Sequence, residues 1–128
     1  MKLLLKLALA LSSLALFASC DAFKAEYGEP EAQFYEAMLP QKGDAFLRKK
    51  ITVKGTVTRH DLSDPKNCML YLGYGIQCNF RDKKEMVESY RLGATVFVDG
   101  ILRSCTPREV LLDPAVGRDP TAKFEPVQ

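Results

Sequence analysis

The sequence predicts a small, mainly β domain in which five strands form a barrel, with one helix between the third and fourth strands and a helical segment before the first. Three observations support this prediction. From residue 51 onward, apolar and polar residues alternate with the period of a strand. The apolar stretches that follow are short and are bounded by glycine, proline, asparagine or aspartate. A helical spacing of apolar residues interrupts them around residue 86.

The first strand is expected to begin at residue 51. Ile51, Val53 and Val57 alternate with polar residues, as in a strand with one buried face. Gly55 falls in the inward row, where a missing side chain is typical of a bend at a barrel corner. A polar loop over residues 61–67 should end this strand.

The stretch CMLYLGYGIQCNF, residues 68–80, predicts the second and third strands as a hairpin around the turn Gly73-Tyr74-Gly75. If Leu72 faces Ile76 across this turn, Cys78 faces Leu70.

A helix should follow. Asp82 and Glu85 have the spacing of a capping box, with Asp82 as the N-cap, and Gly93 is placed to end the helix. Its apolar face would comprise Met86, Val87 and Tyr90.

The fourth and fifth strands are predicted over residues 94–104 and 109–112. Gly100 lies within the fourth strand, at the point where the alternation of inward-facing and outward-facing residues shifts by one residue. Residues 113–128 contain three prolines and little periodicity, which indicates a disordered tail.

The helical segment before the first strand is expected to start near Pro30, because proline suits the first turn of a helix. Pro40 should end it, and Asp44 could cap a second short turn. The helical face would comprise Phe34, Tyr35, Met38 and Leu39, packed over one end of the barrel.

Three strands, a helix and two further strands are the order of the OB-fold, a five-stranded Greek-key barrel. The stretches KKITVKGTVTR, LYLGYGIQCNF and LGATVFVDGILRSC resemble the tRNA_anti-like family of bacterial exported OB-fold domains, many of which are lipoproteins. The resemblance covers roughly residues 34–112 and implies an OB-fold in residues 30–112. The family name reflects a likeness of fold and does not imply binding to tRNA.

The first nineteen residues have the pattern of an export signal. Lys2 and Lys6 precede an apolar run that ends at Phe17, and this run is shorter than the ~20 residues of a membrane-spanning helix. The small pair Ala18-Ser19 suits a signal peptidase.

Phe17-Ala18-Ser19-Cys20 resembles the bacterial lipobox, in which the cysteine is acylated, for example with palmitate, and becomes the first residue of the mature chain. Phe17 departs from the aliphatic residue that is usual at that position. We expect Cys20 to be the lipid attachment site, with residues 20–29 as a tether. The protein would then be anchored in the cell membrane or outer membrane, facing the periplasm or the cell exterior. The alternative is an ordinary signal peptide with an incidental cysteine.

The net charge argues against nucleic acid as the partner. The whole chain has 18 Lys+Arg and 16 Asp+Glu, and removal of Lys2 and Lys6 with the signal leaves 16 of each. Nucleic-acid-binding domains usually carry a clear basic excess. A possible ligand face of the barrel comprises Lys54, Arg59, Tyr71 and Tyr74. We expect it to bind a protein, peptide or glycan of the cell envelope, and oligonucleotide binding is the alternative.

Cys68, Cys78 and Cys105 remain after Cys20, and an oxidising compartment permits one bridge among them, with three possible pairings. The resemblance to the exported family favours a disulfide between Cys78 and Cys105, with Cys68 as a thiol. All three as thiols is the alternative.

The chain offers one candidate for acid–base chemistry, His60 with the nearby Asp61 and Asp64. Adjacent strand residues point to opposite faces, and no motif places a nucleophile beside them. The sequence therefore predicts a non-catalytic module without a cofactor or metal, and a hydrolytic enzyme using His60 is the less favoured alternative.

Overall fold

The computed structural model describes residues 28–128. The predicted signal peptide, the predicted lipid attachment site Cys20 and the predicted tether up to residue 27 lie outside the described residues. No helix within the described part is long and apolar enough to cross a membrane. The elements are β1 (Ala32–Tyr35), α2 (Leu39–Lys42), the 3-10 helix η2 (Gly43–Phe46), β2 (Lys50–Thr56), β3 (Arg59–Asp61), β4 (Met69–Tyr71), β5 (Ile76–Asn79), α3 (Lys84–Ser89), β6 (Thr95–Cys105) and β7 (Val110–Gly117).

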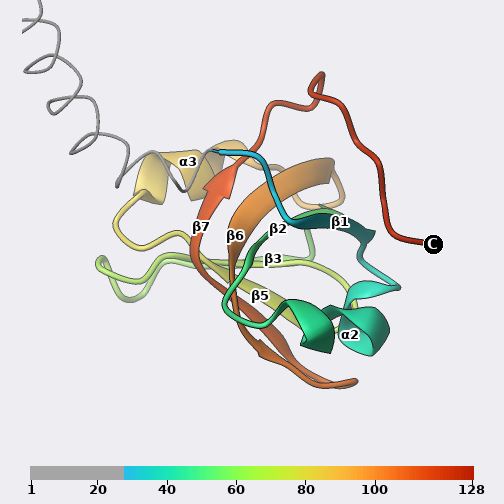
Figure 1. Ribbon diagram of the computed structural model, residues 1–128. Helices are drawn as coiled ribbons and strands as arrows, with labels where there is room; N and C mark the ends of the chain where they lie inside the picture. The colour runs from blue at the N-terminus through green and yellow to red at the C-terminus, as the bar shows by residue number, and fades with distance from the viewer. Residues whose placement is uncertain (1–27) are drawn as a thin grey trace, which may run out of the picture.

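All of these strands belong to one curled sheet in the order β1-β2-β6-β7-β5-β4-β3 (Figure 1). β2 and β3 are the two halves of one bent strand. The N–H of Val57 donates to the carbonyl of Ala94 beside β6, whereas the N–H of Thr58 donates to the carbonyl of Tyr71 in β4. The first strand thus pairs with β6 in one half and β4 in the other, which closes the sheet into a partly open barrel. This strand order, with β5 parallel to β7, is that of an OB-fold.

The mainly β class is confirmed, but the strand count differs from the predicted five. The first barrel strand is interrupted at Val57 and Thr58, and β1 is a further strand, parallel to β2. The predicted helix from Pro30 to Pro40 is wrong. Phe34 reaches the core from β1, opposite Val53, because an extended chain buries it as well as a helix would.

A single helical turn, α2, follows β1, and Pro40 lies in its first turn instead of ending a helix. Asp44 lies inside η2, whose N-cap is Lys42, so Asp44 does not cap this turn.

The predicted hairpin of the second and third strands is confirmed, including its register, since Leu70 faces Cys78. Its turn requires Gly75, which has φ +74°. A Cβ atom at Gly75 would lie 2.2 Å from the carbonyl oxygen of Arg108.

The predicted apolar face of α3 is confirmed: Val87 is fully buried, and Met86 and Tyr90 pack against the core. The capping box is wrong, because Lys83 occupies the N-cap position and no side chain caps the helix there. The helix also ends at Ser89, before Gly93.

The predicted disordered tail is wrong. β7 continues to Gly117, and the residues after it lie against β1 and β6. The N–H of Arg118 donates to the carbonyl of Phe97, and the N–H of Val127 donates to the carbonyl of Gln33 in β1. Proline-rich composition predicted disorder, but Phe124 packs edge-on against Tyr35 of β1 and Phe97 of β6, which holds this C-terminal segment in place.

α2 and α3 lie near opposite ends of the barrel (Figure 1). A cluster of buried apolar side chains forms its core. Phe34 packs edge-on against Phe46 of η2, with ring centroids 5.6 Å apart, and Phe80 packs against Tyr90 after α3, at 6.0 Å. The largest fully buried side chains include Phe34, Phe80, Leu39, Ile51, Leu70, Ile76, Leu102 and Leu112.

Candidate functional site

The structure divides the predicted ligand face into two groups. Lys54 and Tyr74 line one hollow of about 370 Å³, whereas Arg59 and Tyr71 do not line it. We call this hollow the Glu36 hollow. Its lining residues are Tyr35, Glu36, Ala37, Lys54, Thr56, Tyr74 and Thr95.

The Glu36 carboxylate is fixed by backbone donors. Its Oε2 accepts hydrogen bonds from the N–H groups of Thr56, at 3.1 Å, and Gly73, at 3.0 Å. The other oxygen, Oε1, accepts none from residues 28–128. A Cβ atom at Gly55 would lie 2.7 Å from Oε2, so the glycine of the inward row makes room for this carboxylate.

Two tyrosine rings flank the hollow. The side chain of Tyr35 is 47% exposed and that of Tyr74 is 61% exposed. Tyr35 and Glu36 are not predicted as site residues from the sequence, because the apolar spacing around β1 also fits a helix packed on the barrel. The sequence contains one signal for this site, Gly55. A glycine in the inward-facing row leaves a space in the barrel, and the Glu36 side chain lies in that space.

Lys54 is surrounded by aromatic rings. Its Nζ lies 5.5 Å from the ring centroid of Phe97, 5.9 Å from that of Tyr35 and 6.0 Å from that of Phe124. Phe124 stands edge-on to both of the other rings, at centroid distances of 5.3 and 5.4 Å. Cation–π attraction therefore holds the ammonium beside the hollow.

Arg59 and Tyr71 are a cross-strand pair of β3 and β4. The guanidinium lies 4.0 Å from the ring centroid, so one face of Tyr71 is already covered. A nucleic-acid base would have to displace Arg59 before stacking on that face.

His60 and its neighbouring carboxylates are not brought together. His60 faces Leu70 across the sheet, and its Nε2 is enclosed without a hydrogen-bond partner in the described chain. Asp61 accepts hydrogen bonds from the side chain and N–H of Ser63, and these bonds lower its pKa. Asp64 is held in the same way by Asn67 and Lys66, and its pKa is also lowered. Residues 28–128 contain no cluster of metal-ligating side chains.

The predicted disulfide between Cys78 and Cys105 is not formed: Cys68, Cys78 and Cys105 are all free thiols. Cys105 faces Val110, and Val110 pairs with Ile76, two residues before Cys78. The Cys105 thiol instead lies 3.4 Å from the carbonyl oxygen of Leu39.

The two thiols also differ in burial, and burial raises the pKa of each. Cys78 lies in the core, and the pKa of its thiol is raised well above the usual thiol range. Burial is also the main cause of the raised pKa of Cys105, and the nearby Asp44 charge adds to it.

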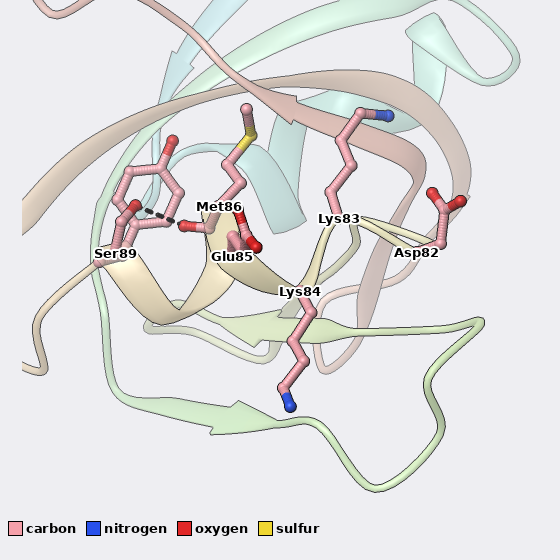
Figure 2. A pocket seen from close by; sticks show the side chains of 7 residues that line it. Asp82, Lys83, Lys84, Glu85, Met86 and Ser89 are labelled. Atoms are coloured by element: carbon pink, nitrogen blue, oxygen red, sulfur yellow. Dashed lines mark hydrogen bonds between the residues drawn. The ribbon is translucent and has the colours of Figure 1, made fainter.

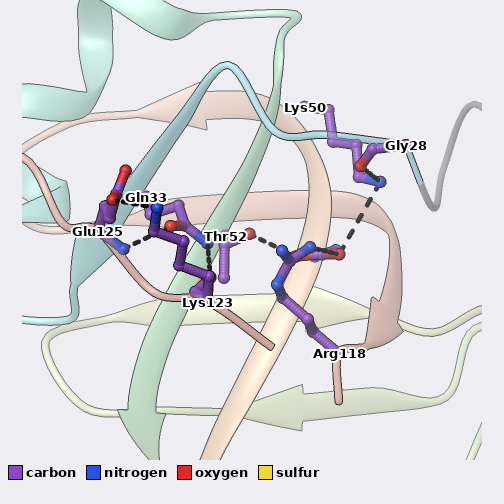
Figure 3. A network of polar contacts seen from close by, with 8 residues as sticks. Gly28, Gln33, Lys50, Thr52, Arg118, Lys123 and Glu125 are labelled. Atoms are coloured by element: carbon purple, nitrogen blue, oxygen red, sulfur yellow. Dashed lines mark hydrogen bonds and ion pairs between the residues drawn. The ribbon is translucent and has the colours of Figure 1, made fainter. Parts of the chain in front are cut away.

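A buried ionic cluster lies between β2, β6 and the residue after β7 (Figure 3). Asp99 is at its centre: Oδ1 accepts a hydrogen bond from Thr52 Oγ1, and Oδ2 lies 3.1 Å from Arg118 Nη1 and 3.8 Å from Lys50 Nζ. Lys50 also donates to the carbonyl of Gly28, which fixes the start of the described chain to this cluster.

A second hollow, of about 740 Å³, lies beside α3 (Figure 2). It is lined by two ammonium and two carboxylate groups, from Asp82, Lys83, Lys84 and Glu85. Lys83 and Lys84 extend away from each other, so these charges do not converge on a shared point (Figure 2).

No family model matches the chain, and no curated protein matches it significantly. Among solved structures, asparaginyl-tRNA synthetase from Entamoeba histolytica, in complex with asparaginyl-adenylate, is 16% identical with a TM-score of 0.47. The match covers 72% of this chain and 25% of the synthetase. A protein assigned as an aspartyl-tRNA synthetase from Leishmania major Friedlin is 12% identical with a TM-score of 0.37, over 79% of this chain and 26% of its own. The chain thus corresponds to about a quarter of each synthetase.

Proposed function

We propose that the protein is a membrane-anchored bacterial lipoprotein whose OB-fold domain is a non-catalytic binding or assembly module of the cell envelope, and that its ligand docks at the Glu36 hollow. The observation that best supports this site is the arrangement of Glu36. Two backbone N–H groups fix its carboxylate, Oε1 is left without a partner in the described chain, and two exposed tyrosines flank it.

The chemistry of the hollow suits a polar ligand with apolar faces. Oε1 can accept a hydrogen bond from a hydroxyl or N–H group, and the rings of Tyr35 and Tyr74 can pack against a sugar ring or an apolar side chain. Lys54 and Glu36 have opposite charges, so the hollow has no formal net charge. A glycan of the envelope carries hydroxyl groups and sugar rings, and a peptide segment carries N–H groups and apolar side chains, so either would suit the hollow.

Two observations favour this function over the alternatives. Asp61 and Asp64 bond within their own loop instead of to His60, which disfavours a hydrolase that depends on His60. Arg59 covers Tyr71, and the mature chain has no basic excess, which disfavours an oligonucleotide site.

The anchor is tested by mass spectrometry of the exported protein. We expect an acylated amino terminus at Cys20, and loss of membrane attachment in a Cys20→Ser variant. An unmodified terminus at any other residue, or membrane attachment of Cys20→Ser, would reject the anchor.

The ligand site is tested by capture of the purified full chain on envelope glycan and on envelope proteins. Glu36→Gln and Tyr74→Ala should each weaken retention by roughly tenfold, because each removes a specific contact. Glu88→Gln, an exposed carboxylate on α3, is the matched control and should bind as the wild type does. Unchanged retention of both hollow variants would reject this site. Tight binding of single-stranded RNA with a steep dependence on salt would instead favour the oligonucleotide function.

A further inference from the structure

A separate pocket of about 330 Å³ lies between the end of α3, the start of β6 and the C-terminal segment. Its lining residues are Ser89, Tyr90, Arg91, Ala94, Thr95, Val96, Phe97, Arg118 and Pro120. We call it the Arg91 pocket. It shares only Thr95 with the Glu36 hollow, so it goes beyond the function proposed above.

The charged groups of the Arg91 pocket are all of one sign. Two arginines line it, and no aspartate or glutamate does. Arg91 is exposed, and its guanidinium forms no ion pair with residues 28–128. A guanidinium in this state attracts anions, and its planar fork matches the geometry of a carboxylate.

Arg118 adds a second positive group to the wall of the pocket. Its side chain is 13% exposed, and Nη1 pairs with Asp99, whose Oδ2 also lies near Lys50 (Figure 3). The Nε–H of Arg118 is enclosed without an acceptor in the described chain. An enclosed charge is costly unless charges of opposite sign surround it, so an anion in the adjoining pocket would stabilise Arg118.

The rest of the wall is mostly apolar. Tyr90, Ala94, Val96, Phe97 and Pro120 supply it. The volume lies at the lower end of the range for small-molecule sites. An ion with no apolar part would leave this surface without a partner, whereas a ring or short chain would cover it.

We propose that the Arg91 pocket binds a small carboxylate that carries an apolar body, with the carboxylate between Arg91 and Arg118 and the apolar part against Phe97 and Pro120. A singly charged planar group fits two guanidiniums better than a doubly charged phosphate, which would retain more of its water in a pocket with so few donors.

Calorimetric titration of the purified full chain at constant ionic strength tests the site with three probes of similar shape: benzoate, benzamide and phenyl phosphate. Benzoate should bind saturably with one site, and neutral benzamide should bind at least about tenfold more weakly, as expected for loss of a hydrogen-bonded charge. Amide resonances of Ser89 and Ala94 should shift during the benzoate titration.

Arg91→Gln should weaken benzoate binding roughly tenfold and leave benzamide unchanged. The exposed Arg91 makes no side-chain contact that folding requires, so this variant should fold. Arg108→Gln, an exposed arginine away from the pocket, is the matched control. Glu36→Gln should leave benzoate binding intact, which separates failure of this site from failure of the Glu36 hollow.

Four results would overturn the proposal: equal affinity for benzoate and benzamide, benzoate binding that Arg91→Gln does not change, resonance shifts confined to other residues, or tighter binding of phenyl phosphate. The last result would assign the pocket to phosphate groups instead.

Discussion

Phe124, near the C-terminus, stands edge-on to Phe97 of β6 with ring centroids 5.3 Å apart, and both rings lie near the ammonium of Lys54. Phe124 belongs to the C-terminal segment, which the sequence predicts to be disordered. Its ring joins Tyr35 of β1 and Phe97 of β6 around Lys54 of β2. This contact and the pairing of Gln33 with Pro126 explain why the last residues are ordered.

Phe124→Ala should lower the free energy of unfolding by about 1–3 kcal/mol, because it removes two edge-on ring pairs and a cation–π contact. Urea unfolding of the purified full chain measures this change. Phe124→Leu, which keeps part of the apolar area, should cost less. No change in either variant would show that the C-terminal segment contributes nothing to stability.

Glu36→Ala should lower the free energy of unfolding by about 2–4 kcal/mol, because the N–H groups of Thr56 and Gly73 both lose their acceptor. Glu36→Gln keeps an oxygen in place and should cost less. Chemical denaturation compares the two variants, and hydrogen exchange at Thr56 and Gly73 should accelerate more in Glu36→Ala. Equal costs for both would contradict the role given to this oxygen.

Asp99→Ala should lower the free energy of unfolding by about 3–5 kcal/mol, because it leaves the enclosed Arg118 without its carboxylate. Thermal and urea unfolding provide the measurement. Glu88→Ala breaks the exposed pair with Lys84 and should cost only about 0.5 kcal/mol, so it is the control for charge removal alone. A similar small cost in both would show that the buried cluster is not a stabilising feature.

Stability should fall as the pH rises above about 8.5, the ordinary pKa of a thiol. Burial raises the pKa of Cys78 in the folded state, so the unfolded chain loses this proton at a lower pH than the folded chain. The stabilisation is therefore complete below the unfolded pKa and is lost progressively above it. The pKa of Tyr90 is raised as well, first by burial and then by the nearby Cys78.

Urea unfolding between pH 7 and pH 10 checks this prediction through the slope of stability against pH. Cys78→Ala should lower the stability at pH 7 and flatten the slope, by up to about 1.4 kcal/mol per pH unit for one group. An unchanged slope would contradict the assignment to Cys78.

The barrel could be predicted from the sequence because its signals are local. The hairpin at Gly75 and the apolar face around Val87 each occupy a few adjacent residues, and each is confirmed. The alternation around Val53 marks the inward row correctly, but the polar row of the same strand is buried as well, since Thr52 is fully enclosed beside Asp99. Hydrophobic periodicity predicts which residues face the barrel interior, but it carries no signal that the opposite face of β2 is buried too.

The Glu36 hollow and the C-terminal segment could not be predicted because their partners are distant in the chain. Phe34 and Leu39 fit a helical face equally well, and only the pairing of β1 with β2 decides the matter. Phe124 meets Phe97 across 26 intervening residues, and no short-range pattern reports such a contact. The disulfide prediction rested on the resemblance to the exported family, and in the structure the Cys105 thiol instead lies beside the carbonyl oxygen of Leu39 in α2.

The pairing of Gln33 with the residues around Pro126 has a consequence for proteolysis and self-association. β1 lies at one end of the sheet order, and the N–H of Val127 donates to the carbonyl of Gln33 on the outer side of β1. An uncovered edge strand is a template for pairing with another chain. Trimming by a carboxypeptidase past Phe124 would bare this edge, and the shortened chains would associate edge to edge and precipitate while the barrel itself stayed folded.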